Sequence, residues 1–137
     1  MMTMIQNLKE LTSNILETMF YLTEETEPIQ KEYDYRYAVC IKDPKVEVIL
    51  LFSVKTAISM TENFLGTDDI SDSDIKDTLK EAINIIMGNF IRVSMNDAET
   101  KINIPFIQEV SQVKTDGYDS EMLFYKEEPL NILLKMG

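Results

Sequence analysis

The feature that most restricts the fold is a pair of alternating apolar stretches between residues 33 and 54, separated by a short turn. Every second residue of each stretch is aromatic or aliphatic: Tyr33, Tyr35, Tyr37, Val39 and Ile41, then Val46, Val48, Leu50, Phe52 and Val54. Because side chains alternate between the two faces of a strand, these residues would share one buried face. The intervening Lys42-Asp43-Pro44-Lys45 is typical of a tight turn. The pattern predicts a β-hairpin.

The opposite face of this hairpin is polar at its ends and apolar at its centre. Ala38, Cys40, Ile49 and Leu51 form the centre, and an apolar patch of this kind needs cover. A second chain is one possible cover, and later strands or a loop of the same chain are the other. We expect Cys40 to be a buried, unreactive thiol.

Three segments have the three- and four-residue apolar spacing of amphipathic helices. They cover residues 4–22, 55–65 and about 72–93. Gly66 follows the second segment and can adopt the left-handed backbone that often ends a helix. Ser71 and Ser73 are both candidate N-caps for the third helix, and the acids beside them suit the positive end of its dipole.

The C-terminal part of the sequence predicts three further strands. They cover residues 101–110, 121–126 and 130–135, with turns at Thr115-Asp116-Gly117 and Glu127-Glu128-Pro129. Pro105 cannot donate a ladder hydrogen bond, so we expect its strand to lie at an edge or to be interrupted. Long helices on one face of a largely antiparallel sheet make an α/β fold of the α+β type.

Composition excludes several classes of function. The 137 residues suit one domain, which we expect to span residues 1–137. The formal net charge is −11, and no cluster of Lys and Arg forms a nucleic-acid or anionic-membrane site. No apolar run approaches the roughly 18 residues of a membrane span, and the N-terminus lacks the pattern of a signal peptide, so we expect a cytoplasmic protein. Without histidine, and with Cys40 as its one cysteine, the chain has no histidine-based triad, zinc finger or internal disulfide.

The third predicted helix carries an unusual polar face. At about 100° per residue, Asp77, Glu81, Asn84 and Gly88 fall within an arc of roughly 60°. Apolar residues gather on the opposite side: Ile75, Leu79, Ala82, Ile83, Ile86 and Phe90. A solvated face is the simplest interpretation. Asn and Gly are nevertheless poor helix formers, and Gly88 leaves space for another surface to come close.

The sequence Asp77-x3-Glu81-x2-Asn84 followed by Gly88-Asn89 resembles the active-site signature of the CheC/CheX/FliY family of chemotaxis phosphatases, which dephosphorylate phosphorylated CheY. The similarity covers most of the chain: ILETMFYL at 15–22, VEVILLFSV at 46–54, the helix that ends at Leu65-Gly66, and KINIPFI at 101–107. By this resemblance the chain is identified as a member of the family.

The match is closer to CheX than to CheC, because CheC-like members repeat the motif on the first helix. There this sequence has Glu10-x3-Asn14, and Phe20 at the third position after Glu17. Neither has the Glu-x2-Asn spacing, so we infer one site per chain.

The resemblance implies a phosphorylated CheY-like receiver domain as the partner, and a homodimer. A receiver domain already holds an acyl phosphate, Mg²⁺ and a lysine, so the protein needs no metal or cofactor of its own. Asn84 would orient the attacking water, because a carboxamide both donates and accepts hydrogen bonds. Glu81 would pair with the partner's lysine. Asp77, Ile85 and Gly88 would contribute to partner binding, although Asp77 also suits the helix dipole alone.

Two other functions remain open at this point. A noncatalytic module could bind a receiver domain or a signalling assembly without hydrolysing anything. A sensor of small molecules is the third interpretation, but the sequence has no glycine-rich or basic anion pocket to support it.

Overall fold

The computed structural model describes residues 3–22, 34–41, 45–94, 106–111, 116–125 and 128–136. In chain order the elements within them are α1 (Met4–Phe20), β1 (Tyr35–Ile41), β2 (Val46–Phe52), α2 (Val54–Leu65), α3 (Asp72–Ser94), β3 (Phe106–Glu109), β4 (Asp119–Tyr125) and β5 (Glu128–Met136). The three predicted helices are therefore present. Gly66 ends α2 in the left-handed conformation, with φ 71°.

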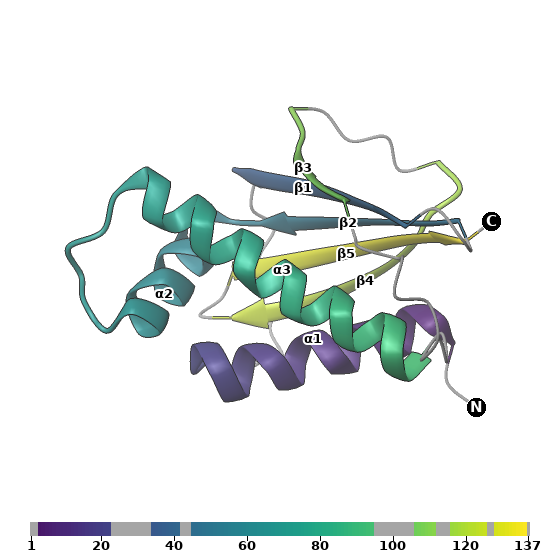
Figure 1. Ribbon diagram of the computed structural model, residues 1–137, viewed down its shortest axis with the longest axis horizontal. Coiled ribbons are helices and arrows are strands. Elements are labelled where there is room, and N and C mark those ends of the chain that lie inside the picture. Colours follow the sequence, from purple (N-terminus) through teal and green to yellow (C-terminus); the bar gives the residue numbers. More distant parts are fainter. Residues whose placement is uncertain are drawn as a thin grey trace.

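The strands form one sheet in the order β3-β1-β2-β5-β4, and each neighbouring pair is antiparallel. The helices cover one face of the sheet, where α3 crosses diagonally and α1 runs below it (Figure 1). This confirms the predicted α/β fold of the α+β type. β3 lies at an edge, as predicted for the segment that contains Pro105, although residues 101–105 lie outside the described residues.

The register of the β1–β2 hairpin turns both apolar rows toward the helices. Tyr37 lies opposite Leu50, and Val39 lies opposite Val48. Opposite residues of an antiparallel pair project to the same face, and these four side chains are fully buried in the main core. The predicted hairpin is confirmed, while Tyr33 and the turn residues 42–44 lie outside the described part of the chain.

The longest helix, α3, has the two faces that its sequence predicts. Its apolar row is buried: Ile75, Leu79, Ala82, Ile83, Ile86, Met87, Phe90 and Ile91. Asp77, Glu81, Asn84 and Gly88 are exposed. Burial of the apolar row fixes the rotation of α3 about its axis. That rotation turns toward solvent the four residues Asp77, Glu81, Asn84 and Gly88, which we refer to as the acid-amide row.

A second, smaller cluster is buried on the opposite face of the sheet. Ile49, Leu51 and Leu133 form it, with Ala38 and Tyr118 packed against it. Because one chain suffices to bury these three side chains, the structure favours cover by a later segment of the same chain over cover by a second copy.

The expectation that Cys40 is buried is wrong, because the thiol is exposed. Cys40 lies one position from the end of β1, opposite Phe106, whose side chain is exposed as well. The cover of the second cluster does not reach this end of the strand.

The expected end of β2 at Val54 is also wrong. β2 ends at Phe52, and Val54 is the first residue of α2. The reason is a helix cap that overrides the apolar alternation: the Oγ of Ser53 accepts a hydrogen bond of 3.3 Å from the backbone N–H of Thr56.

The turn predicted at Glu127-Glu128-Pro129 is too long. Glu128 and Pro129 belong to β5, where they lie opposite Tyr125 and Phe124. Pro129 precedes Leu130, the first β5 residue that pairs with β2. Its missing N–H therefore interrupts no hydrogen bond to β2, and a proline is tolerated at the start of this strand.

Replacing Ile83 by alanine tests the rotation of α3. This side chain is fully buried, so we expect Ile83→Ala to lower the free energy of unfolding by about 2–5 kcal/mol. The exposed neighbour Lys80 is the control, and Lys80→Ala should change it by no more than about 0.5 kcal/mol. Urea denaturation followed by circular dichroism measures both, and equal effects would contradict the rotation described here.

Candidate active site

The first turn of α3 begins at a reciprocal cap. The backbone N–H of Asp74 donates to the Oγ of Ser71 at 3.1 Å, and the N–H of Ser71 donates to the Oδ2 of Asp74 at 2.9 Å. Ser71 is therefore the cap of the two predicted candidates, and Ser73 lies inside the helix. Asp72 and Asp74 lie in the first turn, where the helix dipole favours negative charge.

The same end of α3 is tied to the edge of the sheet by side-chain contacts. The hydroxyl of Tyr35, on β1, donates to the Oδ1 of Asp72 at 2.9 Å. Lys76 Nζ lies 3.3 Å from the Oε1 of Glu109, on β3, and 3.6 Å from the Oδ2 of Asp72. These contacts connect three segments that are far apart in the sequence, and they hold the start of the site helix in place.

Burial and nearby acids raise the pKa of two side chains in this anchor. Burial, followed by the hydrogen bond to Asp72, raises the pKa of Tyr35 to about 12. The carboxylate of Glu109 raises the pKa of Lys76 above its ordinary value. At neutral pH the phenol of Tyr35 is therefore neutral and Lys76 is a cation.

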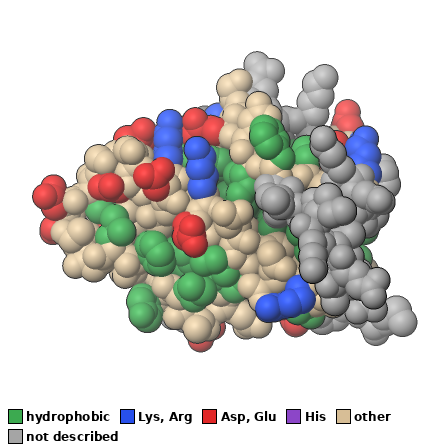
Figure 2. All heavy atoms as spheres, viewed as in Figure 1, with side chains coloured by type: hydrophobic (Ala, Val, Ile, Leu, Met, Phe, Trp, Pro, Cys, Tyr) green, Lys and Arg blue, Asp and Glu red, His purple; other side chains and the backbone are tan. Residues whose placement is uncertain are grey.

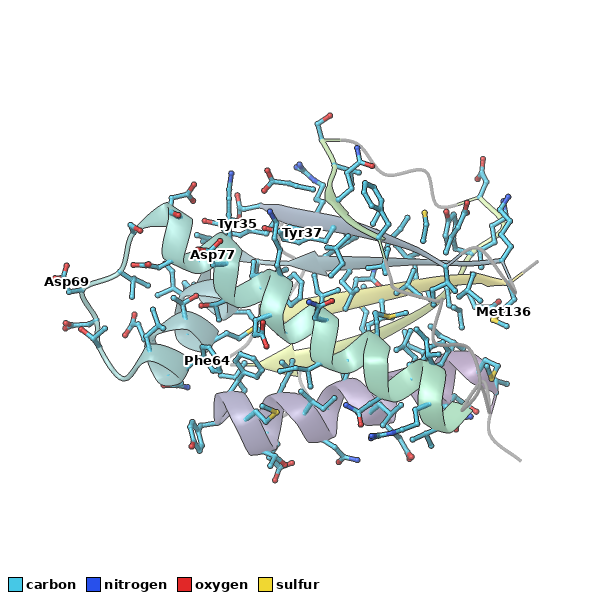
Figure 3. The ribbon with its side chains drawn as sticks, viewed as in Figure 1. Tyr35, Tyr37, Phe64, Asp69, Asp77 and Met136 are labelled. Atoms are coloured by element: carbon cyan, nitrogen blue, oxygen red, sulfur yellow. The ribbon has the colours of Figure 1, made fainter. Side chains whose placement is uncertain are left out.

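The four residues of the acid-amide row follow this anchor along α3, from Asp77, next to Lys76, to Gly88. Asp77, Glu81, Asn84 and Gly88 are all exposed, and Ile85 beside them is half-buried. Figure 3 shows Asp77 on the outer side of α3, near its start. Since the helical repeat brings all four residues to one arc, the structure brings the predicted site residues together on one solvent-facing surface.

The side chains of Glu81 and Asn84 are free of internal partners among the described residues: neither makes a hydrogen bond or ion pair there. Asn89 differs, because its Nδ2 donates to the backbone oxygen of Ile85 at 2.8 Å and its Oδ1 accepts from Arg92 at 2.6 Å. The amide of Asn89 is thus used by the helix itself. The amide of Asn84 remains available to an outside molecule.

The described clefts lie away from the acid-amide row. One cleft of about 680 Å³ lies beside the anchor and is lined by residues that include Tyr35, Asp72 and Lys76. Another of about 620 Å³ is lined partly by Glu10 and Asn14 of α1. Neither Glu81 nor Asn84 lines these clefts or a third one against Val93. Because both side chains are exposed as well, a globular partner can reach them from solvent.

The described residues contain no candidate metal site and no candidate membrane span. No group of three or more His, Cys, Asp or Glu side chains in this part of the chain is arranged to hold a metal ion. None of the described helices is long and apolar enough to cross a membrane.

Sequence reasoning missed the anchor and one group of exposed apolar side chains. Alternation along β1 places Tyr35 in the core, where its side chain lies, but its hydrogen bond to Asp72 depends on how β1 and α3 meet in three dimensions. The apolar group comes from the ends of α1 and α2: Met19, Tyr21, Phe64 and Leu65. Helical periodicity alone does not show that these two ends are neighbours.

Fold and site together define a class: a two-layer α/β protein whose longest helix presents a carboxylate and a carboxamide on an open surface. Residues 41–123, more than half of the chain, match the family described as chemotaxis phosphatase CheX. The chain belongs to the CheX family, which confirms the resemblance drawn from the sequence. No curated protein sequence matches the chain.

Solved structures show the same fold. CheX from Vibrio vulnificus aligns with a TM-score of 0.76 at 14% identity, covering 99% of this chain and 97% of that one. CheX from Desulfovibrio desulfuricans aligns with 0.74 at 20% identity, covering 98% and 99%. A CheX from Borrelia burgdorferi, solved as a CheX-CheY-BeF3-Mg²⁺ complex, aligns with 0.63 at 18% identity, covering 98% and 99%.

The anchor makes stability sensitive to alkaline pH. The folded-state pKa of Tyr35 is about 12 against an ordinary value of 10.0, so the unfolded chain loses this proton first as pH rises. Stability from Tyr35 is therefore fully present below about pH 10 and is lost as pH rises through about 12. We therefore expect the melting temperature of Tyr35→Phe to fall less steeply than that of the parent between about pH 9 and pH 12. Some alkaline fall should remain in the variant, because burial also raises the pKa values of Tyr37 and Tyr118.

At neutral pH, Tyr35→Phe also removes one hydrogen bond and should lower the free energy of unfolding by about 1 kcal/mol. Melting curves of both proteins across the alkaline range measure the two effects. Parallel curves for the parent and the variant would show that the phenol of Tyr35 does not contribute in this way.

Proposed function

We propose that this chain hydrolyses the aspartyl phosphate of a phosphorylated CheY-like receiver domain, with Glu81 and Asn84 as its catalytic residues. The observation that carries the proposal is that both side chains are exposed on one face of α3 and make no hydrogen bond or ion pair with the described residues. Membership of the CheX family and the similarity to a CheX that was solved with CheY and Mg²⁺ support this class of partner.

The reaction needs one thing that a receiver domain lacks, which is a water held in line with the phosphorus. Asn84 holds this water in line, since its carboxamide oxygen accepts a hydrogen bond from the water. The water oxygen then bonds to phosphorus, and the bond from phosphorus to the aspartate oxygen breaks. The products are a free aspartate and inorganic phosphate, which keeps the proton that the water gives up. Mg²⁺ stays on the partner throughout.

Glu81 lies nearly one turn before Asn84 on the same face, close enough for both side chains to contact one partner. Its carboxylate pairs with the partner's active-site lysine and so sets the position of the docked domain. The neutral amide at 84 suits the neighbouring position, because a second carboxylate there would repel the phosphoryl group. Asp77, Ile85 and Gly88 surround the pair and contact the partner without taking part in the chemistry.

Further properties follow from the same proposal. The described residues form one sheet with helices on one face, which supports a single domain over residues 1–137. A receiver domain as substrate implies a cytoplasmic protein. The homodimer that the family resemblance suggested is a further proposal. The second apolar cluster gives it no support, because that cluster is already buried within one chain.

Replacing Asn84 or Glu81 by alanine should separate catalysis from folding. We expect Asn84→Ala to slow the loss of phosphate on the order of a hundredfold or more, as for loss of one preorganised group worth about 2.7–4 kcal/mol. Glu81→Ala should also slow it. Both variants should keep the free energy of unfolding within about 0.5 kcal/mol of the parent, because the side chains are exposed. Release of phosphate from an autophosphorylated receiver domain measures the rate.

The matched controls are Glu10→Ala and Asn14→Ala on α1. They remove the same two residue types, but from positions four apart instead of three. These variants should retain parental activity if the chain has one site. Full activity in both α3 variants would refute the assignment of the site. If the parent protein binds the receiver domain but does not accelerate its dephosphorylation, the chain is instead a noncatalytic binding module.

Gly88 provides a separate test of close approach. A Cβ added there meets no other atom within 4 Å, so Gly88→Ala should stabilise the helix by about 0.5–1 kcal/mol. If the partner's surface comes close at this point, the same change should slow dephosphorylation several-fold, and Gly88→Gln should slow it further. Thermal melting and phosphate release measure the two effects. A gain in stability with unchanged activity in both variants would place Gly88 outside the docking surface.

A further inference from the structure

Four large apolar side chains are exposed at the C-terminal ends of α1 and α2. The exposed fraction is 40% for Met19, 70% for Tyr21, 40% for Phe64 and 46% for Leu65. We refer to these four residues as the apolar shelf. Single exposed apolar residues are ordinary, but a group of them on one surface marks an interaction site more often than chance.

The two helix ends that form the apolar shelf are held against each other. The rings of Phe20 and Phe64 stack with centroids 5.0 Å apart and an interplanar angle of 24°. The Nδ2 of Asn63 donates to the backbone oxygen of Phe20 at 3.0 Å. Phe20 is itself fully buried, so these contacts anchor the shelf to the core. The shelf is therefore a preformed surface.

Tyr21 has a backbone conformation that stability alone does not favour. Its φ of 57° makes it the one described non-glycine residue with a left-handed backbone, and its N–H caps α1 by donating to the oxygen of Leu16. Glycine or asparagine commonly fills such a cap, because other residues adopt this conformation at a cost. The ring meanwhile stays largely in solvent. A strained backbone that displays an exposed aromatic ring points to a function outside the free chain.

The two helices that carry the apolar shelf, α1 and α2, both pack against α3, which carries the acid-amide row. Figure 3 shows Phe64 and Asp77 at the same end of the molecule, and Asp77 shares the exposed arc of α3 with Glu81 and Asn84. Figure 2 shows hydrophobic side chains gathered over the ends of α1 and α2, and acidic side chains on α3 and on the loop before it. The apolar shelf beside the carboxylates of the acid-amide row fits a partner that has an apolar patch next to basic groups.

We propose that the apolar shelf is the part of the docking surface that provides affinity for the receiver domain, while Glu81 and Asn84 provide turnover. This inference depends on the proposed function for the identity of the partner. The proposed catalytic pair consists of two hydrated polar side chains, which give little net affinity on an open surface. Large apolar side chains at the centre of an interface provide most of the binding energy in protein complexes, and tyrosine is prominent among them. The shelf therefore sets how tightly the partner is held before the reaction.

Tyr21→Asn is the most direct test, because asparagine tolerates the left-handed backbone of this cap. We expect its melting temperature to equal or exceed that of the parent. Its Kd for a receiver domain loaded with beryllofluoride and Mg²⁺ should rise about tenfold or more, as for loss of a central contact. In the phosphate-release assay KM should rise while kcat changes by less than about twofold.

A matched pair of methionines gives the control. Met19→Gln removes an apolar side chain from the shelf, and Met136→Gln removes one with 46% exposure at the opposite end of the molecule (Figure 3). The first should weaken binding and the second should not. Parental affinity in both Tyr21→Asn and Met19→Gln, or equal losses in the two methionine variants, would overturn the proposal.

Two further measurements separate the possible failures. If the parent binds the receiver domain through the shelf but does not accelerate dephosphorylation, the shelf proposal stands and the phosphatase proposal fails. If no receiver domain binds the parent, both fail. Light scattering tests a second copy of this chain as the occupant: conversion of a dimer to a monomer by Tyr21→Asn would assign the shelf to self-association and overturn its role in docking.

Discussion

The burial of one face of α3 against the sheet is the interaction on which the rest of the structure depends. Leu79, Ile83 and Phe90 are fully buried there, and a helix with an apolar stripe can satisfy it in only one rotation. Removing these side chains from water supplies stability at about 25 cal/mol per Å². The positions of Glu81 and Asn84 are a consequence of that rotation. The core therefore orients the proposed chemistry without touching it.

Rotation alone does not fix where the helix lies along the sheet, and the polar anchor at its start supplies this second constraint. Tyr35 and Glu109 come from two neighbouring strands at the edge of the sheet, and both contact the first turns of α3. Exposed ion pairs contribute little stability, so the ion pair of Lys76 with Glu109 matters more for position than for energy. The half-buried bond of Tyr35 to Asp72 is the stronger part of this anchor.

Local patterns in the sequence were sufficient to predict the elements that carry the site. The range of α3 and the exposure of Asn84 follow from periodicity within one helix, and local capping chemistry reduced its N-cap to Ser71 or Ser73, of which the structure selects Ser71. Predictions failed where a longer-range effect decided the outcome. The exposure of Cys40 depends on where cover of the outer face ends, and the start of α2 depends on a cap that overrides alternation. The contact between the ends of α1 and α2 joins residues 43 positions apart, so no local pattern contains it.

Three exposed residues are poor choices for stability, each for a different reason. Asn84 replaces a better helix former, Gly88 costs backbone entropy, and Tyr21 holds a left-handed backbone. In the described chain no contact compensates the exposed side chain of Asn84, and the space beside Gly88 is open. Independent costs of this kind would be scattered if they were incidental. Asn84 and Gly88 share one exposed arc of α3, and Tyr21 caps the helix that packs beside it. The proposed docking role gives these three costs one common explanation, in which the residues are retained for a partner's sake at the expense of the free protein's stability.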